Sequence, residues 1–195
     1  MAKAGISTRS EALEIKDFRR LIDGLHNDEE YRWELFCVLS YSLALRISDV
    51  LNLKWQDLLG RDHCTVEEIK TKKIRRIPLE EATLAKVAEL HILMGRPTVS
   101  EHIFLNRKKG VVYTPQYVNQ KLKQFRVWYR LPIRNFSSHT FRKTFGRQVY
   151  NTNGQSEHSI LLINRALRHS SIDTTIVYLG LKQDEVNGIY KQAAI

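Results

Sequence analysis

The stretch Ala166-Leu-Arg-His-Ser-Ser-Ile-Asp-Thr-Thr-Ile-Val-Tyr178 places a tyrosine nine residues after His169. Its polar middle predicts a turn that leads into a short helix and exposes Tyr178. A phenol has a pKa of about 10, so this tyrosine needs a base or strong cations nearby to become a nucleophile. Tyr190, in the final predicted helix, is the one serious rival. Packing in helical or strand-like patterns explains the others: Tyr31, Tyr41, Tyr113, Tyr117, Tyr129 and Tyr150.

A second cluster, Leu45-Arg46-Ile-Ser-Asp49, follows a nearly apolar helical pattern. Side chains three residues apart project from the same face of a helix. We therefore expect Asp49 to fix the guanidinium of Arg46 and to leave its outer edge free for an anion. An ordinary surface ion pair is the competing interpretation of an isolated Arg-x-x-Asp pattern.

The third cluster, Ser138-His139-Thr-Phe-Arg142, has the same spacing. His139 can exchange protons near neutral pH, and Arg142 is a permanent bidentate ligand for phosphate. The serines at 137 and 138 predict a helix start, where free backbone amides also favour anions. His-x-x-Arg is weak by itself. His169 is suited to bonding a phosphate, although interaction with the dipole at a helix C-terminus explains it equally well.

Basic residues give the chain a formal net charge of +10 and lie in separated runs. Such runs suit a groove that follows a phosphate backbone, and they favour double-stranded DNA as the partner. A solvated basic surface is the alternative explanation from charge alone. The runs are Lys70, Lys72, Lys73, Arg75 and Arg76; Arg107, Lys108 and Lys109; and Lys121, Lys123, Arg126, Arg130 and Arg134.

A length of 195 residues suits one well-buried domain. No segment approaches the roughly 18 apolar residues that span a bilayer, and the N-terminus lacks the apolar core of a signal peptide. We therefore expect a cytoplasmic protein with no membrane partner. Cys37 and Cys64 lie in different settings and no Cys/His spacing resembles a zinc site, so we expect buried or half-buried free thiols and no metal.

Hydrophobic periodicity predicts an α+β protein that is mainly helical, with one small antiparallel sheet. The sheet is a hairpin of Cys64 to Ile69 and Ile74 to Leu79 around a basic turn, with a possible third strand from His102 to Leu105. The expected helices include Phe18 to about Gly24, Asp28 to Leu45, Arg46 to Leu53, Glu80 to Leu93, Thr114 to Tyr129, Ser137 to Asn153, Ser159 to Leu167 and Asp184 to Ala193.

The order Arg, Lys, His-x-x-Arg, His, Tyr resembles the tyrosine recombinases, or phage-type integrases, which share their chemistry with type IB topoisomerases. The three quoted clusters carry this resemblance in order and with family-like gaps, from about Ile15 to the C-terminus. It implies the catalytic-domain fold of that family, and the activity of a site-specific recombinase that cleaves and rejoins DNA through a 3′-phosphotyrosyl intermediate without metal, cofactor or ATP.

The resemblance also implies residue roles. Arg46 and Arg142 would clamp the scissile phosphate, His139 and His169 would assist proton transfer, and Tyr178 would be the nucleophile. Counting back from Ile77-Pro78-Leu79 places the family's general-acid lysine on Lys70, with Lys72 and Lys73 as close alternatives. Asp49 would support the site, and four cations are expected to contact DNA: Lys72, Lys73, Arg75 and Arg168.

Two departures from the family pattern stand out. Arg168 occupies the position where the family usually has glycine, so we expect either a different local turn or an extra cation that faces DNA. The segment from Gly154 to His169 is also about three residues longer than usual. The chain starts almost at the catalytic domain, so we expect a single domain over 1–195 without the family's N-terminal core-binding domain. It would be either an excised fragment or a short member similar to fimbrial phase-variation recombinases.

Three functions agree with the sequence. The leading one is a prokaryotic or phage-encoded, nucleoid-associated recombinase, monomeric when free and tetrameric on DNA, whose tail after Tyr178 docks on a neighbouring protomer. A relaxing enzyme of the type IB topoisomerase kind would use the same chemistry without strand exchange. A DNA-binding regulator derived from a recombinase would not need the complete set of reactive side chains.

Overall fold

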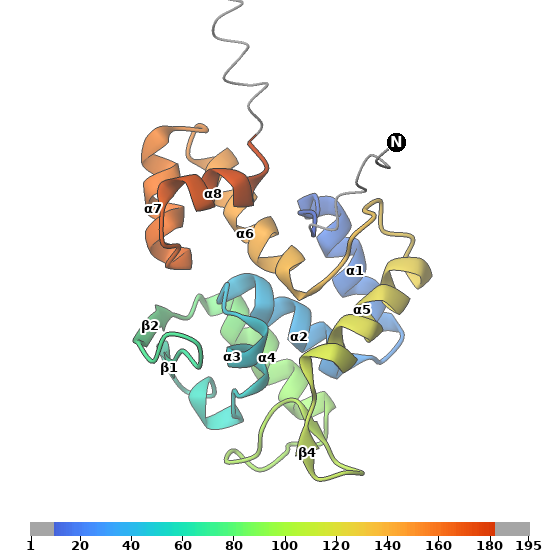
Figure 1. Ribbon diagram of the computed structural model, residues 1–195. Helices are drawn as coiled ribbons and strands as arrows, with labels where there is room; N and C mark the ends of the chain where they lie inside the picture. Colours follow the sequence, from blue (N-terminus) through green and yellow to red (C-terminus); the bar gives the residue numbers. More distant parts are fainter. Residues whose placement is uncertain (1–9, 182–195) are drawn as a thin grey trace, which may run out of the picture.

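The computed structural model describes residues 10–181 (Figure 1). Its helices are α1 (Ile15–Asn27), α2 (Tyr31–Ser42), α3 (Ile47–Leu51), the 3-10 turn η1 (Trp55–Asp57), α4 (Glu81–Leu93), α5 (Pro115–Trp128), α6 (Ser138–Thr152), α7 (Glu157–Leu167) and α8 (Ile172–Leu179). Its strands are β1 (His63–Glu67), β2 (Ile74–Pro78), β3 (Leu105–Asn106) and β4 (Val111–Val112). The mainly helical α+β class with a small antiparallel sheet is confirmed. The helix expected from Asp184 to Ala193, which carries Tyr190, lies outside the described residues.

Helix α2 forms the centre of the fold because it is apolar on nearly every side, as expected for a helix surrounded by other elements. It packs against α1, α4 and α6. Phe36 is fully buried and meets the rings of Phe104 and Phe141 edge-to-face, at centroid distances of 5.5 and 6.0 Å. Cys37 and Cys64 are buried free thiols, as the sequence predicts. Within residues 10–181 no helix is long and apolar enough to cross a membrane.

Some boundaries differ from the sequence prediction. Helix α1 continues past Gly24 to Asn27, because this glycine allows close approach of a ring and does not cap the helix. A Cβ atom at Gly24 would lie 2.7 Å from the Tyr129 ring. Helix α2 ends at Ser42, three residues early, because Ala44 turns into the left-handed region with a φ of 45°. The expected third strand is also displaced: β3 begins at Leu105 and pairs with β4 in a second sheet.

The β1–β2 hairpin has an inner and an outer face set by the period of two along each strand. Antiparallel pairing places Cys64 opposite Ile77 and Glu67 opposite Ile74. Cys64, Glu68 and Arg75 are buried, whereas the turn lysines are exposed. The hairpin therefore points two charged side chains into the molecule and presents its basic turn to solvent.

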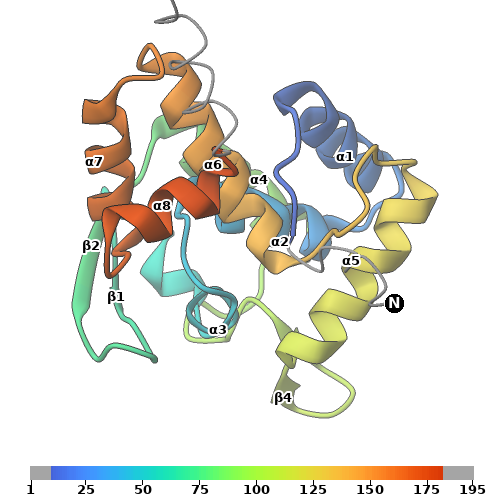
Figure 2. The same cartoon turned by 45° about the horizontal axis from the view of Figure 1, so that its top comes forward.

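Helices α7 and α8 pack on α6 through a small apolar cluster separate from the main core, made of Ala44, Ile163, Leu167 and Leu179. Figures 1 and 2 show α7 and α8 on one side of α6 and α1 on the other, with the hairpin near α7. A Cβ atom at Gly146 of α6 would lie 3.1 Å from the Leu179 Cδ2 atom, so this glycine allows the close packing of α8. Helix α6 thereby connects the main core to the segment that carries Tyr178.

Phe141 tests how strongly the core holds α6. The fully buried ring also packs against Phe18 and Phe136. We expect Phe141→Ala to lower the free energy of unfolding by about 3 to 5 kcal/mol, through lost burial and the cavity left behind. Val127→Ala on α5, 62% exposed, is the control and should change it by less than about 0.5 kcal/mol. Urea denaturation measures both, and similar midpoints would contradict this account of the core.

Candidate active site

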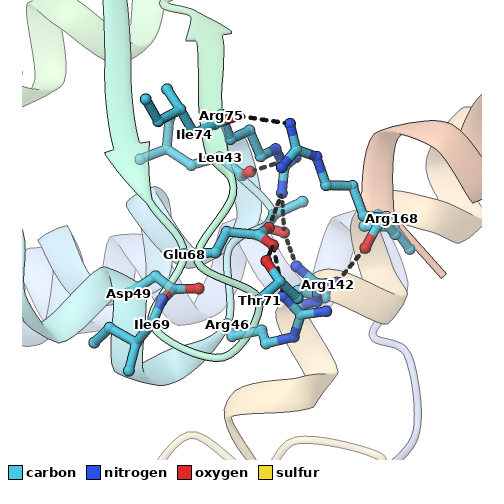
Figure 3. A network of polar contacts seen from close by, with 12 residues as sticks. Leu43, Arg46, Asp49, Glu68, Ile69, Thr71, Ile74, Arg75, Arg142 and Arg168 are labelled. Carbon is cyan, nitrogen blue, oxygen red and sulfur yellow. Dashed lines mark hydrogen bonds and ion pairs between the residues drawn. The ribbon is translucent and has the colours of Figure 1, made fainter. Parts of the chain in front are cut away.

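Arg46 pairs with Glu68, a buried carboxylate at the end of β1. The Arg46 Nη1 atom lies 3.0 Å from Glu68 Oε2, and the Thr71 hydroxyl donates to the same oxygen at 2.7 Å (Figure 3). Burial by itself raises the pKa of the Glu68 carboxyl, but Thr71, Arg46 and Arg75 together outweigh it and hold the pKa below its usual value. The Glu68 carboxylate is therefore ionised at neutral pH and orients the Arg46 guanidinium through their hydrogen bond.

The sequence prediction that Asp49 fixes Arg46 is wrong for this structure. Arg46 precedes α3 with an extended backbone (φ −71°, ψ 153°), so the helical spacing of three does not apply to it. Asp49 is buried, and its Oδ1 atom accepts a hydrogen bond from the Ile69 amide at 2.9 Å. Asp49 therefore supports the site by holding the base of the basic turn.

Arg142 is buried and bonds two backbone carbonyls that are far apart in sequence. Its Nη1 atom donates to the Ala44 carbonyl and its Nη2 atom donates to the Leu167 carbonyl at 3.1 Å. Ala44 presents its carbonyl from the left-handed turn between α2 and α3, and such strained residues concentrate at functional sites. The guanidinium thus joins the α2–α3 turn to the end of α7.

The sequence predicts that Arg75 contacts DNA at the surface. In the structure the Arg75 side chain is buried instead. Its guanidinium donates to the carbonyls of Ala44 at 3.4 Å and Leu43 at 3.3 Å, and lies 3.7 Å from Glu68. Burial lowers its pKa to about 10, and the positive charge of Arg142 adds to this shift. Arg75 therefore connects the hairpin to the turn between α2 and α3 and to Glu68.

Arg168 also differs from its expected place. It caps the C-terminus of α7 in the left-handed conformation, with φ 52° and ψ 49°, which costs an L-residue about 1–2 kcal/mol relative to the right-handed form. Its Nη2 atom donates to the Ile74 carbonyl at 2.8 Å and its Nη1 atom is buried. Figure 3 shows the side chain directed at the hairpin.

Tyr178 on α8 reaches the same cluster. Its hydroxyl donates to the His139 carbonyl at 3.3 Å, and its ring lies edge-on to His169 at a centroid distance of 4.8 Å. The Lys143 ammonium lies 5.3 Å from the ring centre. Burial raises the pKa of the phenol to about 12, although Arg142 and Arg46 oppose this shift. A cavity of about 660 Å³, lined in part by Val177, opens beside the tyrosine.

Both histidines are neutral near pH 7. Burial, with the positive charges of Arg142 and Arg46, lowers the pKa of His169 to about 4. Partial burial of the ring lowers the pKa of His139, and the charge of Arg142 adds to this effect. Because the folded state disfavours protonated imidazole at both positions, these two groups remove stability as the pH falls through and below the ordinary histidine range.

A hydrogen-bond chain runs from Asn164 through Thr175 to His169. The Asn164 amide donates to the Thr175 hydroxyl oxygen at 3.0 Å, and that oxygen lies 3.0 Å from His169 Nδ1. In the tautomer in which the Thr175 hydroxyl donates its proton to Nδ1, Nε2 is the protonated nitrogen. Neutral His169 then presents an N–H donor at Nε2, which suits a phosphate oxygen.

The lysines of the basic turn are exposed. Lys70 lies in the turn over 69–71, and the Lys72 amide donates to the Glu68 carbonyl at 2.8 Å with a φ of 56°. The Glu68 amide donates to the Lys73 carbonyl at 3.0 Å. These bonds define the backbone of the turn that carries the three lysines.

The structure brings together the two arginines, the two histidines and the tyrosine that the sequence selects. Sequence reasoning missed Glu68, although the period of two from Cys64 places it on the buried face of the hairpin. It also missed Thr175, whose role follows only from the fold around His169.

Comparison with known proteins agrees with this arrangement. A family model described as "Phage integrase family" matches residues 11–185. The chain belongs to the phage integrase family. The resemblance drawn from the three sequence clusters is therefore confirmed.

Relatives within the family differ in length. The "Probable integrase/recombinase YoeC" of Bacillus subtilis is 30% identical over 169 residues, covering 85% of this chain and 84% of that protein. "Tyrosine recombinase XerC" of Bradyrhizobium diazoefficiens is 26% identical over 157 residues, covering 80% of this chain and 47% of that protein. The chain thus matches most of the first relative and about half of the second.

Solved structures of recombinases share the fold. "Crystal structure of XerA recombinase" gives a TM-score of 0.71 at 20% identity, covering 98% of this chain and 66% of that one. A pre-cleavage complex of the XerH site-specific recombinase with its difH substrate gives 0.70 at 17% identity, covering 95% of this chain and 56% of that one. The expected recombinase catalytic-domain fold is confirmed.

Glu68 gives a direct test of the cation cluster. Glu68→Gln keeps the shape and an acceptor for Thr71 but leaves Arg46 and Arg75 without a counter-charge. Removing one partner of a buried ion pair leaves a buried charge without compensation, so we expect the free energy of unfolding to fall by about 3 kcal/mol. The neighbouring exposed Glu67→Gln is the control, with a change within about 0.5 kcal/mol. Equal urea midpoints for the two variants would show that the buried carboxylate matters no more than a surface charge.

Proposed function

We propose that this protein is a site-specific recombinase that cleaves and rejoins strands of double-stranded DNA through a 3′-phosphotyrosyl intermediate. The observation that carries the proposal is the convergence of Tyr178, Arg142 and Arg46 around one buried cluster. A phosphodiester carries one negative charge, and two guanidiniums match its non-bridging oxygens. The family and the named relatives support the same conclusion.

In the proposed reaction, the Tyr178 oxygen attacks the scissile phosphorus and loses its proton. The P–O bond to the 5′ oxygen breaks, and that oxygen takes up a proton as a 5′-hydroxyl. Arg46 and Arg142 stabilise the charge on the phosphoryl oxygens as it develops, which is the role of preorganised cations in such sites. Rejoining reverses these steps, and since one ester replaces another, no ATP is consumed.

The free protein holds its nucleophile in a protonated state. The Tyr178 phenol has a raised pKa of about 12, and its hydroxyl donates to the His139 carbonyl. We infer that docking of the phosphate draws the hydroxyl from this carbonyl toward phosphorus. Neutral His139 provides a base near the phenol, while His169 bonds a phosphoryl oxygen through Nε2.

The proton for the leaving oxygen is assigned to the hairpin turn. Asp49 fixes the base of the turn and Glu68 its interior, so an ammonium there can be aimed at the cleavage site. We assign the general acid to Lys70 and DNA-backbone contacts to Lys72 and Lys73. These side chains are exposed in the DNA-free structure, as a group that meets the substrate must be.

Assembly is part of the proposal. We infer a monomer when free and a tetramer on DNA, in which the tail beyond Tyr178 docks on a neighbouring protomer. As a DNA-binding protein, it would be associated with the nucleoid. A type IB-like relaxing activity would appear as cleavage and rejoining without strand exchange, and a pure DNA-binding regulator as binding without cleavage.

Tyr178→Phe tests the nucleophile. A duplex nicked close to the cleavage site traps the covalent product, because the short strand diffuses away before rejoining. We expect the wild type to form a protein–DNA adduct that resists denaturant and is unaffected by EDTA, and Tyr178→Phe to form none. Tyr190→Phe is the matched control and should keep the adduct. An adduct that persists in Tyr178→Phe and disappears in Tyr190→Phe would overturn the assignment.

A second substrate tests the general acid. Sulfur in place of the bridging 5′ oxygen gives a leaving group that needs no proton, so loss of the acid should not matter. We expect Lys70→Ala to slow adduct formation about 100-fold or more on the ordinary duplex and by less than about threefold on the sulfur-substituted one. Lys72→Ala and Lys73→Ala are matched controls, and the selective defect in either would move the role to that lysine.

A further inference from the structure

The turn between α7 and α8 contains an arginine in a conformation that favours glycine. Arg168 caps α7 with a φ of 52°, whereas Gly180 performs the equivalent task at the end of α8 with a φ of 70°. Glycine adopts this region without a steric penalty. An arginine at this cap therefore carries backbone strain that glycine would avoid.

The side chain of Arg168 reaches the hairpin. Its Nη2 atom donates to the carbonyl of Ile74, the first residue of β2, at 2.8 Å. Within residues 10–181 this is the one hydrogen bond that joins the β1–β2 hairpin directly to the α7–α8 segment. Ile74 pairs with Glu67 at the base of the turn that carries Lys70, so the bond fixes the hairpin next to its basic turn (Figure 3).

The position of the Arg168 guanidinium is also electrostatically unfavourable. It lies close enough to Arg75 to lower the pKa of that residue, after the larger effects of burial and Arg142. Its Nη1 atom is buried and has no hydrogen-bond partner within the described residues. A guanidinium that only served to bind DNA would instead point to solvent. Backbone strain, repulsion and a buried donor all accompany this one contact with the hairpin.

We propose that Arg168 is a positioning residue that ties the hairpin turn carrying Lys70 to the segment carrying His169 and Tyr178. The proposal rests on the function proposed above. In that reaction the nucleophile acts on one side of the phosphorus and the general acid on the other. One hydrogen bond between the two segments sets their separation before DNA arrives, which is the preorganisation that phosphoryl transfer requires.

Arg168→Gly removes the hydrogen bond to Ile74 and also relieves the backbone strain. Because glycine favours this backbone conformation, we expect the variant to fold. Arg96→Gly is the matched control, because Arg96 is an exposed arginine with the same φ of 52°, in the loop after α4. In the free protein, we expect amide hydrogen exchange over residues 67–74 to be at least about fivefold faster in Arg168→Gly than in the wild type. Arg96→Gly should leave it unchanged, and unchanged exchange in Arg168→Gly would overturn the tether.

Cleavage of the two nicked duplexes then separates positioning of the acid from other effects. We expect Arg168→Gly to slow adduct formation about tenfold on the ordinary duplex and by less than about threefold on the sulfur-substituted one, as for loss of a general acid. Arg96→Gly should match the wild type on both. Equal defects on the two substrates, or none, would overturn the coupling. A wild type that forms no adduct would refute the proposed function, and the exchange measurement alone would then decide on the tether.

Discussion

Two arginine side chains converge on one backbone carbonyl, that of Ala44, and the rest of the site depends on this convergence. Arg142 donates to it from α6 and Arg75 from β2. The carbonyl is available because Ala44 turns into the left-handed region and ends α2 early. A buried carbonyl needs a donor, and a buried guanidinium needs acceptors. Each therefore limits where the other can lie, and three segments of the chain meet at this point.

The side chains around this point carry more positive than negative charge. Arg46 and Arg75 form ion pairs with the buried carboxylate of Glu68, and the charges of Arg142 and Arg168 also act on Arg75 (Figure 3). The carbonyls of Leu43, Ala44, Leu167 and Ile74 supply the remaining acceptors without cancelling the charge. Like charges held together by the fold raise the free energy of this cluster, and in the proposed reaction the scissile phosphate would relieve that repulsion. Burial lowers the pKa of both histidines, and the charges of Arg142 and Arg46 add to this shift, so neutral imidazoles keep their hydrogen-bonding and proton-accepting capacity.

The local sequence pattern predicts helix starts well where a capping side chain or a proline marks them. The Thr114 cap with proline at the first position of α5 and the Ser137 cap of α6 lie where expected. The prediction is wrong where the role of a residue depends on a contact with a residue far away in the sequence. The sequence pattern predicts a helix end near Gly24, but in the structure this glycine makes room for the Tyr129 ring. Asp49 was paired with Arg46 by helical spacing, but the structure pairs it with Ile69, because Arg46 lies just outside the helix.

The sequence by itself determined which reactive side chains are present and in what order, because three short clusters with fixed gaps identify the family. It also determined the two faces of the hairpin, since the period of two along a strand assigns each side chain to a face. Only the tertiary structure decided the partner of each cation. Arg142 and Ala44 are 98 residues apart, and Arg168 and Ile74 are 94 apart. Contacts between such distant residues follow from how helices and hairpin pack in space, and local spacing carries no record of that packing.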